Sequence, residues 1–498
     1  LDFVKYSERT CKTMKHMSCF FGILLDKYKN LGTPVKAAFW FLVCSVLQKG
    51  IAMLTTPVFT RIMTEEAYGK YTLYNSWYTI VFAIVSLNLA AGVYTRGLIA
   101  NEEDQPAYSA ALVGLSTLCI FFGFIGYIFF RAAINDILQL STFMMTFMFV
   151  EMWSNSIFQF WSHRERANYK YKKLIILTLS YILLRSLLSI IAVLLVEPQY
   201  QMQSRVVVTT TIGVILYFWL FVKFIKDGKT LYNKKYWKHA LQFNIPLIPH
   251  YLSQILLNQS DKIMIGKLCD ETKVAYYSVA YSIAMLLLIL NSSINSTMNP
   301  WMYRKIKEKD YQEIEKVSYL VLVLIAACNF FVVAAGPELL ALLAPASYQN
   351  AVWLIPPLTT SVYFIFLYSL FATFEYYYSE TKYVAVASFL GAALNLLLNY
   401  ICIKYFGYIA AGYTTMVCYI IFVMLHYLFM RKVNRKYMDN VKVYKISVIL
   451  LIGFSLLIAS SIMMFIYNYV VIRYVIMLLI VLLVACNFKR ISSNLRFR

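Results

Sequence analysis

The chain has 498 residues, of which 60% are hydrophobic, 17% aromatic and only 14% charged. No water-soluble domain of this length has such a balance, so the composition excludes that class and predicts a protein embedded in lipid. The formal charge of +22 could indicate nucleic acid binding, but Lys and Arg fall in short clusters between apolar runs, as in loops that face anionic lipid headgroups. We therefore expect no nucleic acid partner.

The first 36 residues are basic and only weakly apolar, with a short apolar patch at Cys19–Leu25. This patch is too short for the hydrophobic core of a secretory signal peptide followed by a cleavage site. We interpret residues 1–36 as a cytoplasmic tail on the membrane surface, and we treat Met14 or Met17 as the hypothetical start of the mature chain.

Fourteen apolar stretches follow the tail, each near the length of about 20 residues that a helix needs to cross roughly 30 Å of hydrocarbon. Strands of a barrel would instead alternate over about 10 residues, so the predicted fold class is all-α. The expected spans are 37–60, 72–95, 110–130, 138–162, 174–196, 206–225, 241–261, 274–299, 317–336, 351–375, 384–403, 409–429, 447–467 and 473–488.

The distribution of basic residues gives an independent test of this count. With the N-terminal tail inside, the inner segments hold 35 of the 46 Lys and Arg residues and the outer loops hold 9. Lys49 and Arg185 are the two that remain, and both lie within spans. Cytoplasmic loops carry an excess of Lys and Arg, so the pattern predicts fourteen spans with both ends in the cytoplasm.

The chain also shows a weak internal repeat. Span 1 contains Pro57 and leads into an acidic turn followed by Tyr68, and span 7 contains Pro246 and Pro249 and leads into a similar turn before Tyr276. Such repeats are common in secondary transporters, whose substrate site lies between the halves. We expect a six-helix bundle over 37–225, a cytoplasmic linker over 226–240, a second six-helix bundle over 241–429, and two further helices with a cytoplasmic tail over 430–498.

Residues 36–71 carry a recognisable motif: Pro57, then Thr60 and Arg61, then the acidic Glu65-Glu66 turn and Tyr68-Gly69. This stretch, together with Phe243-Asn-Ile-Pro-Leu-Ile-Pro-His-Tyr-Leu and Asn258-Gln-Ser-Asp-Lys, resembles the bacterial polysaccharide flippases. These belong to the multidrug/oligosaccharidyl-lipid/polysaccharide exporter superfamily.

The resemblance implies that the chain is a flippase in the bacterial cytoplasmic membrane. Its substrate would be an undecaprenyl-diphosphate-linked oligosaccharide, moved from the inner to the outer leaflet for O-antigen, capsule or teichoic-type polymer assembly. It also implies two protein partners, a polysaccharide polymerase and a chain-length regulator.

Two cations lie near the middle of apolar spans, Lys49 in span 1 and Arg185 in span 5. A charge at the bilayer centre costs about 2.5–3.5 kcal/mol on insertion scales, so it usually faces a wet cavity or a partner. Both could hold the substrate diphosphate. The alternative is a structural ion pair with Glu151, which is also in mid-span. Arg61 is added as a substrate-binding candidate because it belongs to the family motif.

Polar side chains also recur every four residues, which places each set on one face of a helix. Such faces could line a hydrophilic cavity for sugar hydroxyls or join helices by hydrogen bonds. We expect packing for Asn395 and Asn399. His250 and His163 could relay protons, although a lone His more often has a structural role. The candidates for the cavity lining are Glu151, Asn155, Gln159, His250, Gln254, Asn258, Asn291 and Asn295.

Two other functions fit parts of this pattern. A drug or metabolite antiporter of the same superfamily would require a carboxylate in the first helix, where this chain has Lys49. A membrane polymerase or ligase of lipid-linked sugars would require a large outer loop, and no predicted loop exceeds about 17 residues.

The sequence has no phosphate-binding glycine motif and no Cys-x-x-Cys spacing. We expect no enzyme activity, cofactor or metal, and leave coupling to H⁺ or Na⁺ open.

Overall fold

The computed structural model describes residues 32–494, and these residues form helices without a β-strand. The helices before the linker are α2 (Thr33–Ile62), α3 (Glu65–Val85), α4 (Thr95–Ala100), α5 (Gln105–Phe129), α6 (Arg131–Leu138), α7 (Thr142–Ala167), α8 (Tyr171–Leu194) and α9 (Gln201–Gly228). The linker helix is α10 (Lys234–Asn244). It is followed by α11 (Ile248–Leu268), α12 (Glu271–Glu308), α13 (Tyr311–Ala334), α14 (Gly336–Leu343), α15 (Ile355–Tyr377), α16 (Thr381–Phe406), α17 (Ala410–Tyr437), α18 (Ile446–Ile466) and α19 (Val470–Asn494).

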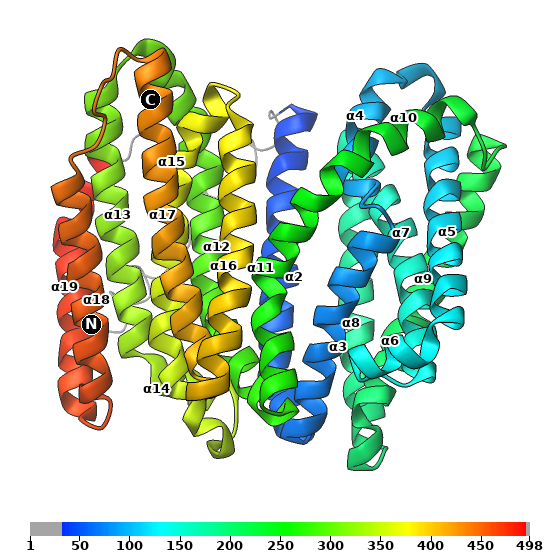
Figure 1. The fold of residues 1–498 in the computed structure, drawn as a ribbon, viewed down its shortest axis with the longest axis horizontal. Coiled ribbons are helices and arrows are strands. Elements are labelled where there is room, and N and C mark those ends of the chain that lie inside the picture. The colour runs from blue at the N-terminus through cyan, green and yellow to red at the C-terminus, as the bar shows by residue number, and fades with distance from the viewer. Residues whose placement is uncertain (1–31, 495–498) are drawn as a thin grey trace, which may run out of the picture.

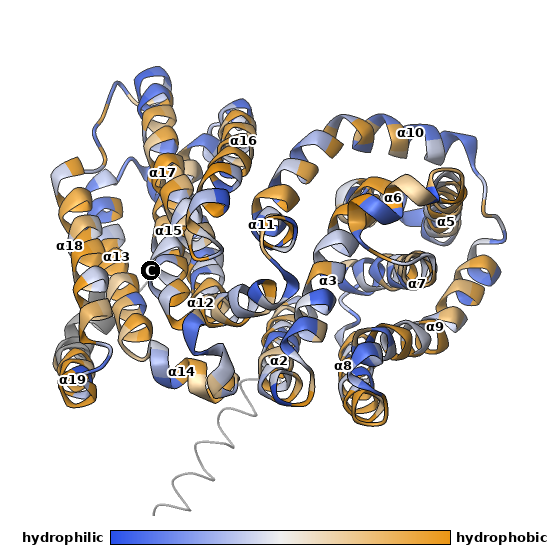
Figure 2. Cartoon of the chain, turned by 60° about the horizontal axis from the view of Figure 1, so that its bottom comes forward, coloured by the Kyte–Doolittle hydropathy of each residue, from blue (hydrophilic) through white to orange (hydrophobic). Residues whose placement is uncertain are grey.

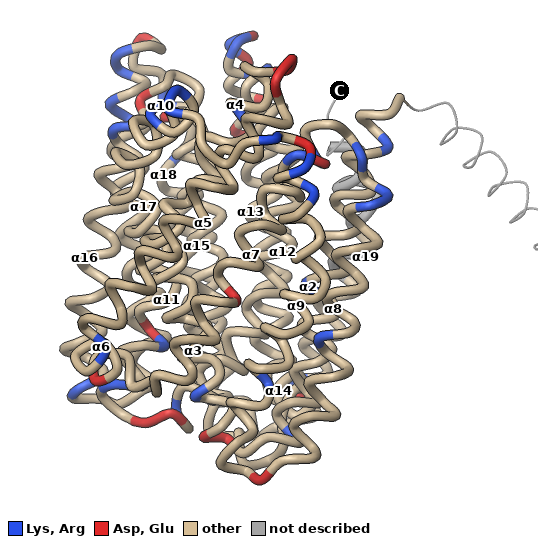
Figure 3. Tube along the Cα trace, turned by 90° about the vertical axis from the view of Figure 1, so that its right-hand side faces the viewer, with Lys and Arg blue, Asp and Glu red and all other residues tan. Residues whose placement is uncertain are grey.

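The long helices run side by side, with hydrophobic residues over most of their length (Figure 2). Lys, Arg, Asp and Glu gather at the two ends of the bundle (Figure 3). By length and composition, ten of the described helices could cross a membrane, or twelve if each of two bent pairs is one span. Water-free lipid requires such internally hydrogen-bonded helices. The chain is therefore a multi-pass, all-α membrane protein.

The ten single helices and the two bent pairs together coincide with twelve of the fourteen expected spans. The seventh and fourteenth expected spans fall on α10–α11 and on α19. Helix α11 carries three charged residues, and the apolar part of α19 is the shorter segment Val470–Leu482. The exact number of fourteen therefore stays a prediction. The expected N-terminal tail lies outside the described residues, except for its last five, and so do the hypothetical starts Met14 and Met17.

The helices form two groups, with α3 to α9 on one side and α12 to α19 on the other, and α2 and α11 between them (Figure 1). Helix α3 packs along α11 and α12, and the C-terminal end of α2 contacts α14. The contact of α3 with α12 is so close that a Cβ on Gly69 would lie 1.7 Å from the carbonyl oxygen of Glu271. A glycine is needed there because no side chain fits between the two backbones.

Three expected spans have different bounds in the structure because proline and loop residues break the helices. The chain bends by 63° between α3 and the segment Ala90–Ala100, and by 88° between α6 and α7. The expected span 241–261 is wrong by about seven residues, because Pro249 is in the first turn of α11, which runs on to Leu268. Proline favours the first turn of a helix, where its missing N–H has no partner to lose.

The second helix of each expected repeat begins in the same way. Thr64 precedes α3 and accepts a hydrogen bond from the backbone N–H of Ala67, and Asp270 precedes α12 and accepts one from the N–H of Lys273. Both are N-caps that satisfy a free N–H group in the first helical turn. The two helices thus share a type of N-cap, and the repeat of two six-helix bundles stays a prediction.

Candidate functional site

A cavity of about 480 Å³ lies among α2, α3, α7, α8 and α9. Two arginines line it, Arg185 from α8 and Arg205 from α9. Tyr71 and Asn75 of α3 and Asn155 of α7 add polar groups to its wall. We call this space the arginine cavity. It combines two cations with hydroxyl and amide groups inside a bundle whose outer surface is apolar.

Aromatic rings hold both guanidinium groups. The Arg205 guanidinium carbon lies 3.5 Å from the ring centre of Phe59 and 3.7 Å from that of Tyr71. The Arg185 guanidinium carbon lies 5.7 Å from the ring centre of Tyr181. A planar guanidinium that stacks on a ring keeps its N–H groups at its edge, where they can form paired hydrogen bonds with a phosphate.

The proposed ion pair of Arg185 with Glu151 is not formed among the described residues. Glu151 instead accepts a hydrogen bond of 2.9 Å from the hydroxyl group of Tyr74. One turn further along α7, Asn155 donates to the hydroxyl oxygen of Tyr78 at 2.7 Å and lines the cavity. Gln159, the third residue of this face, is half-buried and is not among the lining residues.

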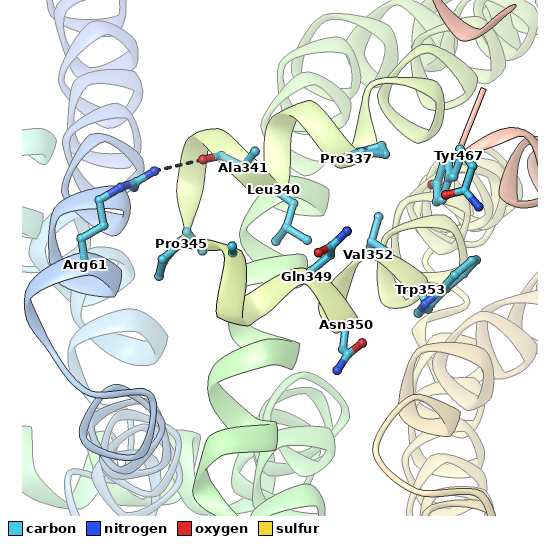
Figure 4. Close-up of a pocket in the computed structure, with 13 residues that line it drawn as sticks. Arg61, Pro337, Leu340, Ala341, Pro345, Gln349, Asn350, Val352, Trp353 and Tyr467 are labelled. Atoms are coloured by element: carbon cyan, nitrogen blue, oxygen red, sulfur yellow. Dashed lines mark hydrogen bonds between the residues drawn. The ribbon is translucent and has the colours of Figure 1, made fainter. Parts of the chain in front are cut away.

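The other two candidate cations lie elsewhere on α2. Lys49 is exposed, and its neighbour Gln48 lines the arginine cavity instead. Arg61 lies at the end of α2 and donates hydrogen bonds to the carbonyl oxygens of Ala341 at 3.0 Å and Leu342 at 3.2 Å (Figure 4). These carbonyls end α14, so Arg61 satisfies free acceptors of that helix and joins α2 to α14.

The polar faces of α11 and α12 mainly join helices. Gln254 donates to the Ser388 hydroxyl of α16 at 2.6 Å, and Asn291 donates to the Val362 carbonyl of α15 at 2.8 Å. Asn295 accepts from Ser369 at 3.3 Å. Asn258 bonds within its own helix, and His250 is half-buried beside Tyr251. The structure brings none of these five residues to the arginine cavity.

A buried carboxylate forms the second polar centre. Asp261 of α11 is 4% exposed. One carboxylate oxygen accepts from Tyr277 at 2.5 Å and Thr415 at 2.8 Å, and the other accepts from Asn399 at 2.6 Å and Asn395 at 3.3 Å. We call Asp261, Tyr277, Asn395, Asn399 and Thr415 the Asp261 cluster. No described Lys, Arg or His forms an ion pair with it.

The Asp261 cluster has the chemistry of a hard-cation or proton site. Its carboxylate oxygens are ligands that hard cations prefer, and the amides of Asn395 and Asn399 present their N–H groups to them. A buried charge with only neutral partners is costly, and a bound cation or proton would neutralise it. Among the described residues, no group of three or more His, Cys, Asp and Glu side chains is arranged so that it could hold a metal ion.

Arg205 and Asp261 were not selected as site residues from the sequence. Arg205 was assigned to an outer loop because its span was expected to begin at 206, whereas α9 begins at Gln201. Asp261 is the last residue of the expected span 241–261, whereas the structure places it inside α11. The proline at position 249 was the available signal, because a helix that begins there places Asp261 in its interior.

Two solved structures share the architecture of this chain. The lipid II flippase MurJ in an inward closed conformation aligns with a TM-score of 0.66 and 15% identity, over 90% of this chain and 98% of that chain. An inward-facing multidrug resistance MATE transporter of the MOP superfamily aligns with a TM-score of 0.55 and 12% identity, over 78% of this chain and 96% of that chain. The helices therefore define a membrane protein with the fold of these transporters.

Sequence comparison identifies the family. The profile of the family described as polysaccharide biosynthesis protein matches residues 35–305, and the MatE profile matches residues 246–401. The chain belongs to the polysaccharide biosynthesis protein family, which confirms the resemblance seen in residues 36–71. Protein 1 of the Lsg locus of Haemophilus influenzae is 23% identical over 399 residues, which are 74% of this chain and 92% of that protein.

Proposed function

We propose that the protein is a flippase that moves an undecaprenyl-diphosphate-linked oligosaccharide from the inner to the outer leaflet of the bacterial cytoplasmic membrane. The product would serve O-antigen, capsule or another surface polysaccharide, together with a polymerase and a chain-length regulator. The observation that carries the proposal is the pair Arg185 and Arg205, which share one cavity inside a lipid-embedded bundle.

The chemistry of the substrate explains why two arginines are needed. A diphosphate headgroup carries negative charge through the hydrocarbon layer, and Arg binds phosphate through two parallel hydrogen bonds. The tyrosine, asparagine and threonine groups of the same wall suit sugar hydroxyls. The exposed Lys49 remains a candidate for an early contact with the headgroup. Arg61 is a candidate for connecting the two halves.

The proposed topology has fourteen spans with both ends in the cytoplasm, in two six-helix halves followed by two helices. Transport would proceed by alternating access, with the halves 37–225 and 241–429 moving against each other. Several bonds between the halves support a closed outer end. Thr60 donates to the Leu343 carbonyl at 2.6 Å, and Tyr276 donates to Glu65 at 2.7 Å.

The close contact at Gly69 gives a test of this closed end. In Gly69→Ala the new Cβ would overlap the backbone of Glu271, and such overpacking costs about 1–3 kcal/mol, or about 5- to 150-fold in the population of the closed state. We expect transport to fall and a membrane-impermeant thiol reagent to label Cys269, beside this interface, more strongly in intact cells with a permeabilised outer membrane.

Gly50→Ala is the matched control, because a Cβ on Gly50 of α2 would meet nothing within 4 Å. It should leave both transport and Cys269 labelling unchanged. Wild-type transport and labelling in Gly69→Ala, at normal protein abundance, would contradict a closed state in which α3 and α12 touch.

The Asp261 cluster favours a second candidate function, a cation antiporter for drugs or metabolites. Such a transporter exchanges its substrate for H⁺ or Na⁺, and a buried carboxylate with neutral partners is a suitable cation site. In the flippase proposal the same cluster would bind the coupling ion, and the arginine cavity would bind the anionic substrate. A cationic drug would be repelled by Arg185 and Arg205, which is why we prefer the flippase.

A further inference from the structure

A second large cavity, of about 680 Å³, lies at one end of the first helix group. Its walls are the C-terminal ends of α7 and α9, the N-terminal ends of α5 and α8, and Glu102, which precedes α5. The adjoining segments 163–173 and 223–239 hold 5 and 6 of the Lys and Arg residues, so this is the end that the basic residues predict to be cytoplasmic. The cavity shares no lining residue with the arginine cavity.

The cavity changes from charged to apolar along the helices. On α9 the lining residues are Asp227, Lys223, Trp219 and Leu216, spaced by three or four residues on one face. From Asp227 to Leu216 this face extends about 16 Å into the membrane. Ile176 of α8, on the facing wall, is 67% exposed and Trp219 is 48% exposed. The deep end of the cavity is thus open to lipid chains.

The charged end contains a carboxylate with one oxygen that no described residue meets. Glu165 of α7 is 6% exposed, and its Oε2 atom has no hydrogen-bond partner among the described residues. A buried carboxylate is costly unless a cation meets it. The adjacent Arg164 does not form an ion pair with it in the described part of the chain, because the Arg164 guanidinium stacks on Phe224 at 4.5 Å and lies 3.9 Å from Asp227.

Cations line the rim of the same cavity. Lys170 and Lys173 are exposed, and Lys223 is half-buried. Within residues 32–494 no carboxylate forms an ion pair with any of the three. Ammonium groups at headgroup depth attract phosphate. The cavity therefore has ammonium groups that can donate to a phosphate, next to a carboxylate that can bind a cation.

We propose that this cavity binds a phospholipid with an amino headgroup, of the phosphatidylethanolamine type. The phosphate would lie between Lys170 and Lys173, the ammonium group would meet Glu165 and Asp227, and one acyl chain would follow Ile176 and Trp219. An anionic lipid without an amino group fits less well, because it carries no cation for Glu165, whereas Asp227 already has Arg164 at 3.9 Å. A soluble phosphate would leave the apolar end of the cavity empty.

Native mass spectrometry of the purified full-length protein, with phosphatidylethanolamine and phosphatidylglycerol of identical chains, tests the proposal. We expect the wild-type protein to retain one phosphatidylethanolamine with a preference of about tenfold, the size of one charge-assisted hydrogen bond. Glu165→Gln keeps the shape of the side chain and should remove the preference. Lys170→Gln with Lys173→Gln should weaken the binding of both lipids.

Lys234→Gln with Lys235→Gln is the matched control, because these α10 residues are exposed and do not line the cavity. It should bind as the wild type does. If Glu165→Gln is poorly folded by size exclusion, Asp227→Asn should reduce the preference and Ser180→Trp should block the apolar end for both lipids. Equal or tighter binding of phosphatidylglycerol by the wild type, or an unchanged preference in these variants, would overturn the proposal.

Discussion

Replacing Arg185 and Arg205 together by Gln should abolish surface polymer in cells that depend on this protein, while its membrane abundance stays near normal. Each charge-assisted contact to phosphate contributes about 1.5–3 kcal/mol, or about 10- to 150-fold in affinity, so the two losses together exceed what transport could tolerate. Gln keeps a polar side chain at each position. The measurement is polymer display in cells that lack their own flippase, with the protein level scored in the same membranes.

Single substitutions separate a role in substrate binding from a structural role. Arg205→Lys should retain part of the activity, since the charge remains but the planar group stacked on Phe59 and Tyr71 is lost. Arg131→Gln, on the exposed α6, is the matched control and should display polymer normally. A structural pair with Glu151 would instead lower the abundance of Arg185→Gln, with rescue by Glu151→Gln. Full display by the double variant would exclude the arginine cavity as the substrate site.

Asp261→Asn should uncouple transport from the ion gradient that drives it. The substitution removes the only carboxylate of the Asp261 cluster but keeps a side chain of the same shape next to Tyr277, Asn399 and Thr415. A neutral amide no longer needs a cation or proton. In proteoliposomes with imposed Na⁺ or proton gradients, wild-type transport should follow one of the gradients and the variant should follow neither.

Asp261→Leu separates this effect from a structural one. It removes the acceptor of four buried donors, of which Asn399 keeps a bond to Asn395, and each unpaired donor costs about 1–3 kcal/mol, so we expect a marked loss of folded protein. Asn399→Asp would add a second carboxylate and should tighten cation binding. Gradient dependence in Asp261→Asn equal to that of the wild type would exclude the Asp261 cluster as the coupling site.

Hydropathy and basic-residue counts were sufficient to place most helices, because lipid allows few alternatives to long apolar helices. They failed where a helix contains charges or a break. Asp261, Lys262 and Lys267 lower the apolarity of α11, so the window that best matched a span shifted toward Leu241 and crossed the proline break. Because of this shift of about seven residues, Asp261 falls at the end of the expected span, although it lies inside α11.

The arrangement of the site depends on tertiary contacts that the periodicity of the sequence does not reveal. Arg185 could be selected because a cation in the middle of an apolar span is costly. Arg205 could not, since it lies in the second turn of α9 and reaches the cavity only through its packing on Phe59 of α2. Asn291 and Asn295 share a face of α12, but the bonds of that face to α15 are set by tertiary packing.

The most direct test of the proposed function is a flipping assay with purified protein in liposomes. The substrate is an undecaprenyl-diphosphate-linked oligosaccharide placed in one leaflet, and a membrane-impermeant glycosidase outside reports its arrival in the other. We expect cleavage that depends on the protein and is lost in the Arg185→Gln, Arg205→Gln variant. Transport of a cationic drug by the same liposomes, with no movement of the lipid-linked sugar, would contradict the flippase proposal and establish the antiporter.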